Sequence, residues 1–313
     1  MSQKIQWNGI FPAISVPLNA DYSINEAEFR RYVSWIAGFE EFHGIVCNGH
    51  ASEITTFSRQ ERKEMLRIVV DEVGGRCPVI CAINCEGTLE AIRHISDAEE
   101  IGADAVLVQP SHLWLRSGAS KESVLAHFRA ICESTDLDVA AQVYSAATKA
   151  FYPIDTLLGL AELPNIKAFK MATRNSAMFE RDMRILKEKA PHIGRFTCHD
   201  DSLLTSMHAQ VDGAIVGFAG WAPELVIGAW NAVQSKDYGK IKEYDELLFH
   251  VANVTYGTGI PSCDAHARAK EVLHQRGFFS SGLARLPVMP LSESAKADIG
   301  EALKKSHLKK YQF

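Results

Sequence analysis

Eight short runs of apolar residues alternate along this chain with longer amphipathic segments. The runs are almost continuously apolar, which is typical of strands buried on both faces of a parallel sheet. This alternation favours a sheet of parallel strands covered by helices, either closed into a barrel or left open. The strands are expected at residues 9–18, 43–49, 78–84, 103–110, 138–145, 166–172, 195–199 and 212–219.

Helical periodicity fills the intervals between these runs. The clearest helix start is a capping box formed by Ser58 and Glu61, followed by an apolar stripe that ends at Val73. Gly102 stands where the residue after a helix is expected, directly before the fourth run. Eight helices are expected at residues 25–39, 58–73, 88–102, 121–134, 155–163, 176–190, 201–210 and 223–234.

Eight strands, each followed by a helix, predict a (β/α)₈ barrel, the TIM barrel. An open doubly wound sheet is the alternative, but the first run is not followed by the G-x-G-x-x-G fingerprint of dinucleotide-binding sheets. Three further helices are expected at residues 236–256, 261–276 and 292–306. Since no low-complexity linker precedes them, we expect a barrel over residues 1–235 and a C-terminal helical extension over residues 236–313 packed on it.

Composition excludes several classes of protein. The 313 residues are 47% hydrophobic and 23% charged, the proportions of a globular chain and not of a disordered one. A net charge of −5 argues against a nucleic-acid partner, because such proteins need a basic surface. No run approaches the roughly 20 apolar residues of a membrane span, and residues 1–4 lack a signal-like apolar core. A cytoplasmic protein is expected, and its seven cysteines, none of them in a C-x-x-C pair, are expected to be reduced, mostly buried thiols.

Chemistry in a TIM barrel takes place at the C-terminal ends of its strands, which restricts the search to eight short stretches. In the sixth run, alternation places Ala168, Lys170 and Ala172 on one face, with Lys170 near the strand end. Burial of a lysine favours its uncharged amine, which is a nucleophile. The alternative interpretation is a structural lysine paired with a carboxylate on a neighbouring strand.

Two more candidate catalytic residues stand at the ends of other predicted strands. Tyr144 ends the fifth run and could transfer protons to a bound intermediate; the alternative is a core aromatic whose hydroxyl binds a backbone group. His50 follows the second run and could act as an acid or base near neutral pH, or be an ordinary loop histidine.

The loop that carries His50 has the small residues Gly49, Ala51 and Ser52. Small side chains leave room for backbone N–H groups to approach an anion. Glu53, at the end of this loop, is expected to orient it by accepting hydrogen bonds from the loop amides.

Together these residues resemble the dihydrodipicolinate synthase / N-acetylneuraminate lyase family of class I aldolases over nearly the whole chain. The motifs that carry the resemblance are the opening strand at residues 9–18, the G-x-x-G-E loop at residues 49–53 with Ser52 in place of the second glycine, Tyr144, Lys170 within F-K-M-A-T, the segment 212–216 and the proline-rich stretch 285–291.

The resemblance implies a mechanism. Lys170 would attack the ketone of pyruvate or another 2-oxo acid and form a Schiff base, and an aldehyde would be the second substrate or product. Tyr144 would relay protons, and no metal or cofactor is implied. His50, a catalytic candidate, would either replace a hydroxyl of the family's proton relay or exclude the usual second substrate. A homotetramer built as a dimer of dimers is also implied. The substrate-binding residues carried over are Gly49, Ala51, Ser52, His112, Lys149 and Val216.

Several positions depart from the family pattern. His50 and Ala51 replace two hydroxyl residues, and Lys149 replaces an arginine that follows the tyrosine. Residues 111–114 replace a segment that usually brings tyrosines. Because Lys170 and Tyr144 are kept, we expect retained Schiff-base chemistry with a changed second substrate. The aromatic residues expected to line a larger or more apolar pocket are Trp114, Phe218 and Trp221.

Three other functions stay open at this point. One is the narrower 4-hydroxy-tetrahydrodipicolinate synthase reaction of pyruvate with aspartate semialdehyde. Another is a catalytically inactive protein that binds a 2-oxo acid. The third is a metal-dependent aldolase or hydrolase, for which the candidate ligands are His199, Asp200, Asp201 and His208.

Overall fold

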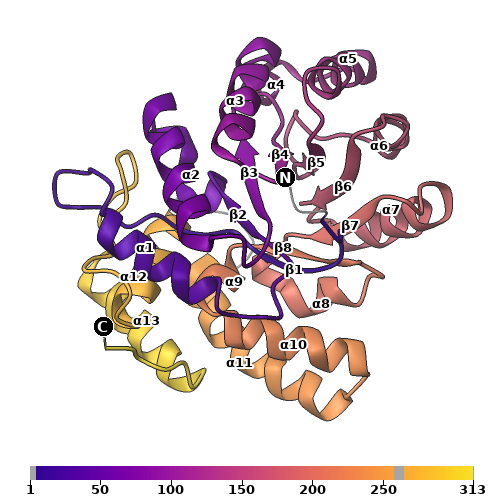
Figure 1. The fold of residues 1–313 in the computed structure, drawn as a ribbon. Helices are drawn as coiled ribbons and strands as arrows, with labels where there is room; N and C mark the ends of the chain where they lie inside the picture. The colour runs from indigo at the N-terminus through magenta and orange to yellow at the C-terminus, as the bar shows by residue number, and fades with distance from the viewer. Residues whose placement is uncertain (1–4, 257–263, 313) are drawn as a thin grey trace.

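The computed structural model describes residues 5–256 and 264–312, and its centre is one eight-stranded sheet in which every paired strand is parallel (Figure 1). The strands follow one another in the order β1-β8-β7-β6-β5-β4-β3-β2, and bridges from Ile10 to Phe42 and from Ala13 to Val46 bring β1 beside β2. The predicted TIM barrel is therefore confirmed. The strands are β1 (Gly9–Pro12), β2 (Ile45–Cys47), β3 (Val79–Ile83), β4 (Ala105–Val108), β5 (Asp138–Val143), β6 (Ile166–Met171), β7 (Gly194–Thr197) and β8 (Gly213–Val216).

Alternate side chains of the strands enter two separate cores. Ala168 of β6 and Ile215 of β8 belong to the cluster that fills the barrel interior. Phe169 and Val216, their neighbours in sequence, belong to the larger cluster between the strands and the helices. A strand whose two faces are both apolar looks in sequence like a continuous apolar run, which is why the eight runs were recognisable.

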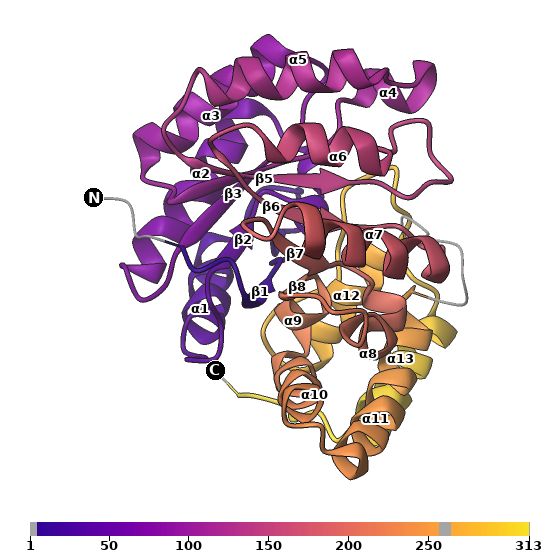
Figure 2. The ribbon, with the colours of Figure 1, turned by 90° about the vertical axis from the view of Figure 1, so that its right-hand side faces the viewer.

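The helices surround the barrel (Figure 2). Ser58 and Glu61 form the expected capping box, and Gly102 ends its helix with a φ of 102°. Two short helices, α4 and α9, were not expected. The helices up to the eighth unit are α1 (Glu26–Ile36), α2 (Arg59–Val73), α3 (Thr88–Ile101), α4 (His112–Ser117), α5 (Lys121–Cys132), α6 (Ile154–Ala161), α7 (Ser176–Lys189), α8 (Leu203–Met207), α9 (Phe218–Trp221) and α10 (Pro223–Ser235).

Three more helices follow, α11 (Tyr238–Tyr256), α12 (Asp264–Gln275) and α13 (Glu293–Lys305), and α12 packs against α9 at the barrel. Fully buried Arg276 ties this extension to the barrel: its Nη1 donates to Trp221 O and its Nη2 pairs with Glu224, both at 2.5 Å. The boundary at residues 235 and 236 stays a prediction. Residues 1–4, the expected helix start at residue 261 and Cys263 lie outside the described residues.

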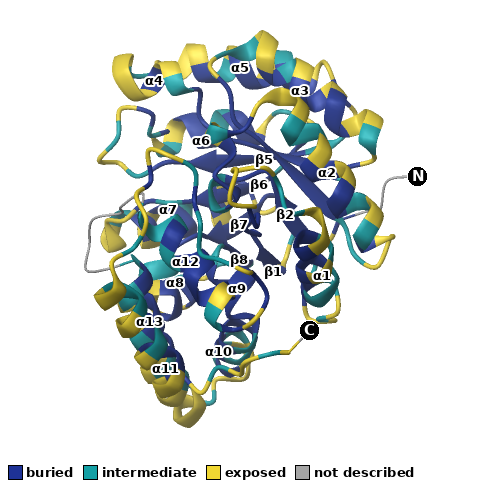
Figure 3. Cartoon of the chain, turned by 90° about the vertical axis from the view of Figure 1, so that its left-hand side faces the viewer, coloured by how far each residue is buried: buried dark blue, intermediate teal, exposed yellow. Residues whose placement is uncertain are grey.

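Burial follows the same layering (Figure 3). The strands are buried, and the outer helices present exposed faces. The six cysteines in the described ranges are free thiols, and all except half-buried Cys77 are buried. Within those ranges no helix combines the length and the hydropathy that crossing a membrane requires.

Candidate active site

A cavity of about 250 Å³ opens at the C-terminal ends of the barrel strands. Residues from five strand ends, from the loop after β2 and from the C-terminal extension surround it. Its lining residues are Ala13, Ser15, His50, Ala51, Gln142, Lys170, Ala172, Arg174, Cys198, Asp200, Gly217, Trp221, Tyr256, Ala265, His266 and Ala269.

Lys170 enters this cavity from β6. It stands in register with Gln142 of β5 and Phe196 of β7, and it is only 9% exposed. In the described part of the chain its amine makes no ion pair with a carboxylate, so the alternative of a structural ion pair between strands is not observed. Lys170 is also the only lysine among the described residues that line the cavity, which makes it the candidate nucleophile.

Tyr144 follows the end of β5 and meets His50 across the barrel mouth. The Tyr144 hydroxyl lies 2.9 Å from His50 Nε2. Burial raises the pKa of Tyr144 above its ordinary value. Burial, and then the positive charges of Lys170, His266 and His112, lower the pKa of His50 to about 3. At neutral pH the pair is therefore a neutral imidazole bonded to a neutral phenol, and the Tyr144 hydroxyl has a side-chain partner instead of a backbone one.

The loop after β2 is a 3₁₀ turn over His50–Ser52. Ser52 is buried, and its hydroxyl donates to Ile14 O at 2.6 Å, which fixes the turn against β1. The Ser52 N–H donates to Gly49 O at 3.1 Å, so this amide is already used inside the loop. His50 and Ala51 are the two residues of the loop that line the cavity.

The expected role of Glu53 is wrong. The residue has a left-handed backbone, with φ 53°, and its carboxylate accepts no hydrogen bond from the amides of residues 49–52, all of which the structure describes. The carboxylate forms a buried ion pair with Lys270 of α12 and accepts the Arg285 N–H at 2.8 Å. Glu53 therefore joins the loop to the C-terminal extension.

The other predicted binding residues do not line the cavity. Lys149 is exposed, and its Nζ donates to Arg116 O at 3.1 Å. His112 Nδ1 lies 3.2 Å from Glu86 Oε1. Val216 is fully buried in the core between strands and helices, because its β8 position faces outward.

Of the three predicted aromatic residues, only Trp221 lines the cavity. Phe218 stacks on Trp221 with ring centroids 4.0 Å apart, so it supports this wall from behind. Trp114 packs edge-on against His127 and Tyr152 and belongs to the core.

The lining residues that were not predicted as part of this cavity include Arg174, Asp200, Tyr256 and His266. Burial raises the pKa of Asp200 to about 6, and its Oδ1 accepts the Phe218 N–H at 2.7 Å. Arg174 could have been found, because it follows the end of β6 by three residues. Tyr256 and His266 carry no such signal, since only the folded extension brings them to the barrel mouth.

The proposed metal ligands do not gather. His199 packs its ring against Phe179 with centroids 4.5 Å apart, and Asp201 pairs with Arg174. Across residues 5–256 and 264–312, no three histidine, cysteine, aspartate or glutamate side chains are grouped as metal ligands.

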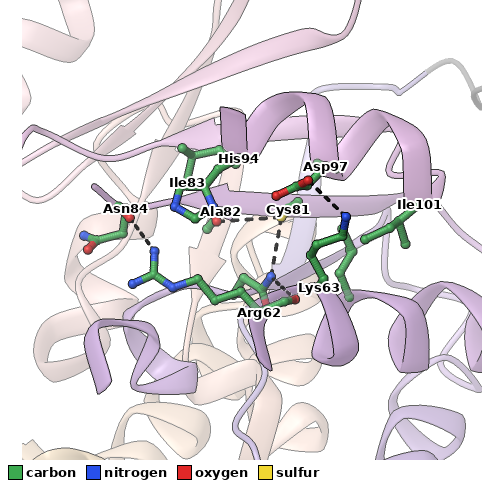
Figure 4. A pocket seen from close by; sticks show the side chains of 12 residues that line it. Arg62, Lys63, Cys81, Ala82, Ile83, Asn84, His94, Asp97 and Ile101 are labelled. Atoms are coloured by element: carbon green, nitrogen blue, oxygen red, sulfur yellow. Dashed lines mark hydrogen bonds and ion pairs between the residues drawn. The ribbon is translucent and has the colours of Figure 1, made fainter. Parts of the chain in front are cut away.

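A second, much smaller cavity lies between α2, α3 and β3 (Figure 4). The two cations around it are paired within the fold: Arg62 Nη1 donates to the backbone carbonyl of Asn84 at 2.7 Å, and Lys63 pairs with Asp97 at 3.1 Å. Its volume of about 20 Å³ has room for one water molecule. This cavity is a structural feature and not a substrate site.

Comparison with known proteins agrees with this geometry. The model of the dihydrodipicolinate synthetase family matches residues 6–306. A 4-hydroxy-tetrahydrodipicolinate synthase of Polynucleobacter asymbioticus is 32% identical over 307 residues, which cover 96% of this chain and 95% of that protein. A probable 5-dehydro-4-deoxyglucarate dehydratase of Bradyrhizobium sp. is 27% identical, over 97% of this chain and 94% of that protein.

Solved structures share the fold. A prophage protein of E. coli K12 from the dihydrodipicolinic acid synthase family, in complex with pyruvate, has a TM-score of 0.86 and 23% identity, over 96% of this chain and 99% of that one. The barrel, its helical extension and the match over almost the full length lead to one conclusion: this chain belongs to the dihydrodipicolinate synthetase family, whose members are lyases of the aldolase type.

Proposed function

We propose that this protein is a Schiff-base lyase or aldolase that acts on pyruvate or another 2-oxo acid together with an aldehyde. The observation that carries the proposal is the buried Lys170, which lies in the same cavity as His50, and His50 is hydrogen-bonded to Tyr144. A buried amine without a carboxylate partner is suited to attack a carbonyl carbon.

The reaction would begin when the Lys170 amine attacks C2 of the 2-oxo acid. The resulting carbinolamine loses water and leaves a protonated imine. This cation accepts the electron pair of an adjacent C–C bond when the bond breaks, and returns the pair when the bond forms. The hydroxyl of the carbinolamine needs a proton to leave as water.

Tyr144 would supply that proton from its hydroxyl. In one tautomer, His50 Nε2–H donates to the Tyr144 oxygen and stabilises the phenolate that forms. When the direction reverses, the phenolate takes the proton back, and in the other tautomer His50 Nε2 accepts a hydrogen bond from the Tyr144 hydroxyl. The imidazole can serve in both ways because its lowered pKa, about 3, keeps it neutral at pH 7.

The 2-oxo acid carboxylate would bind to the backbone N–H groups of His50 and Ala51, which line the cavity beside Lys170. Gly49 and Ser52 would shape this turn through their mutual backbone hydrogen bond. Lys149, His112 and Val216 do not line the cavity, and we propose no contact between them and the substrate.

Borohydride trapping tests the proposal. The protein is incubated with pyruvate, reduced, digested and analysed by mass spectrometry. The expected result is a reduced adduct on the peptide that contains Lys170, absent from Lys170→Arg. A Lys167→Arg variant is the matched control, since Lys167 is a half-buried lysine of the same strand whose Nζ donates to Pro164 O. Absence of an adduct at Lys170 with every 2-oxo acid tried would contradict the mechanism.

The 4-hydroxy-tetrahydrodipicolinate synthase reaction is a narrower candidate, favoured by the relative that is 32% identical. An assay with pyruvate and aspartate semialdehyde decides it. An adduct at Lys170 without turnover of any aldehyde would support the inactive binding protein instead. We also propose that the protein is cytoplasmic and forms a homotetramer, a dimer of dimers. Light scattering of the purified protein tests the oligomeric state.

A further inference from the structure

Arg174 stands in the cavity wall close to the candidate nucleophile. It lies four residues after Lys170, beyond the end of β6, and its side chain is 33% exposed. Its Nη1 forms an ion pair with Asp201, in the turn after β7. Within the described ranges, its Nε and Nη2 donors have no acceptor. One edge of the guanidinium is therefore anchored and the other is available.

The charge balance of the cavity makes this cation distinctive. Among the described residues that line the cavity, Arg174 is the only arginine and Asp200 the only one with a carboxyl group. Burial raises the pKa of Asp200 to about 6, so its negative charge is incomplete just below neutral pH. Lys149, which the family resemblance places among the substrate-binding residues, lies outside this cavity. In the part of the chain that the structure describes, the arginine that faces the cavity therefore comes from the β6 side, and Lys149, on the β5 side, does not face it.

We infer that Arg174 is a specificity-determining residue that binds a second carboxylate of the substrate, distal to the carboxylate of the 2-oxo acid. The inference rests on the proposed function and narrows it to substrates with two acidic ends. A guanidinium presents paired donors that match a carboxylate, and Asp201 holds the group in one orientation. Asp200 beside the same wall opposes a dianion such as a phosphate ester more strongly than a carboxylate.

Trapping with matched pairs of 2-oxo acids tests this without knowledge of the aldehyde. 2-Oxoglutarate is compared with 2-oxopentanoate, and 2-oxoadipate with 2-oxohexanoate; the members of each pair differ in a terminal carboxylate or methyl group. The measured quantity is the concentration that gives half-maximal adduct at Lys170. We expect at least one dicarboxylate to need a concentration roughly 10- to 100-fold lower than its partner, the effect of one or two charge-assisted hydrogen bonds.

Arg174→Gln should abolish this preference, whereas Arg174→Lys should keep part of it because the charge remains without the planar fork. Arg184→Gln is the matched control: Arg184 is an exposed arginine on α7 that pairs with Glu180, and the preference should be unchanged. Trapping of pyruvate by each variant reports that the fold and Lys170 are intact.

The outcomes separate the two proposals. An unchanged preference in Arg174→Gln, or no preference in the unmodified protein, overturns the role of Arg174 when pyruvate is still trapped. Failure of the unmodified protein to trap pyruvate overturns the proposed function itself. If Arg174→Gln does not fold, the comparison of Arg174→Lys with Arg184→Gln decides, and equal preferences in these two variants contradict the inference.

Discussion

Tyr144 and His50 share a single hydrogen bond of 2.9 Å, and the proposed relay depends on it. Tyr144→Phe should slow formation of the Schiff base with pyruvate by about 10²- to 10⁴-fold, the usual contribution of general acid–base catalysis. His50→Gln should slow it as well. If the two side chains act as one unit, the double variant should be no slower than the slower single variant. Quenching with borohydride at short times measures these rates.

Tyr152→Phe is the control for this experiment. Tyr152 is fully buried outside the cavity, and its hydroxyl has no hydrogen-bond partner within the described residues. Its removal should leave the rate unchanged. Independent, multiplicative effects of Tyr144→Phe and His50→Gln would argue against a shared relay.

At the scale of the elements, β1 and β8 pack so closely at the β1–β8 seam, where Gly9 pairs with Gly213, that a side chain on Gly213 has no room. Gly213 and Gly9 are partners in register, and a Cβ on Gly213 would overlap the Gly9 carbonyl oxygen and lie 2.6 Å from the Phe196 ring. Gly213→Ala should lower the free energy of unfolding by about 3 kcal/mol or more, since backbone cannot move aside as a flexible side chain can. Urea denaturation measures the change.

Gly87→Ala is the matched substitution. Gly87 precedes α3 with an extended backbone, φ −161°, and a Cβ there meets no atom within 4 Å. Its effect should stay within about 1 kcal/mol, the range of helix-cap changes. Equal effects of the two substitutions would show that the β1–β8 seam relaxes.

The buried pair of Glu53 and Lys270 joins the loop after β2 to α12. Both side chains are almost fully buried, at 2% and 1% exposure. Lys270→Met leaves the Glu53 carboxylate buried without a counter-charge and should cost about 3–5 kcal/mol of stability. Combining it with Glu53→Gln should recover most of that loss, because no buried charge is then left. Urea denaturation of the three variants checks this, and a double variant no more stable than Lys270→Met would contradict it.

At the scale of the whole molecule, buried histidines couple stability to pH. Burial lowers the pKa of His50 to about 3 and the pKa values of His127 and His199 to about 4. In the unfolded chain histidines take up protons near pH 6.5, so between pH 6.5 and 4 the unfolded state binds more protons. The contribution of these histidines to the free energy of unfolding should therefore be fully present above pH 6.5. It should fall as the pH decreases, by up to about 1.4 kcal/mol per pH unit for each histidine.

Asp200 acts in the opposite direction. Its raised pKa, about 6, means that the folded state binds its proton first, so this group stabilises the protein as the pH falls from 6. Because three histidines oppose one aspartate, the free energy of unfolding should still decrease as the pH falls. Denaturation at pH 7, 6 and 5 measures it, and His127→Gln should make the slope shallower. A slope that His127→Gln leaves unchanged would remove this histidine from the explanation.

The features that could be predicted from the sequence are those that depend on a local pattern of residues. The eight strands follow from apolar runs, and the candidates Lys170 and Tyr144 follow from counting to the strand ends. The helices α4 and α9 were missed because they are too short, at six and four residues, to display a helical period. Glu53, Tyr256 and His266 were misjudged or missed for another reason: their contacts join segments about 200 residues apart or depend on how the extension folds back, and no local pattern encodes that.

Because α12 supplies part of the cavity wall, the residues proposed to react and part of the wall that contacts the substrate come from two different stretches of chain. Lys170, Tyr144 and His50 belong to the barrel, whereas Ala265, His266 and Ala269 come from the extension. Selection can therefore remodel what the enzyme accepts without touching the groups proposed to react. A chimera that exchanges residues 236–313 with a relative should inherit a new wall around the same chemistry. Such an exchange must preserve Glu53 and Glu224, because these two barrel carboxylates pair with Lys270 and Arg276 of the exchanged segment.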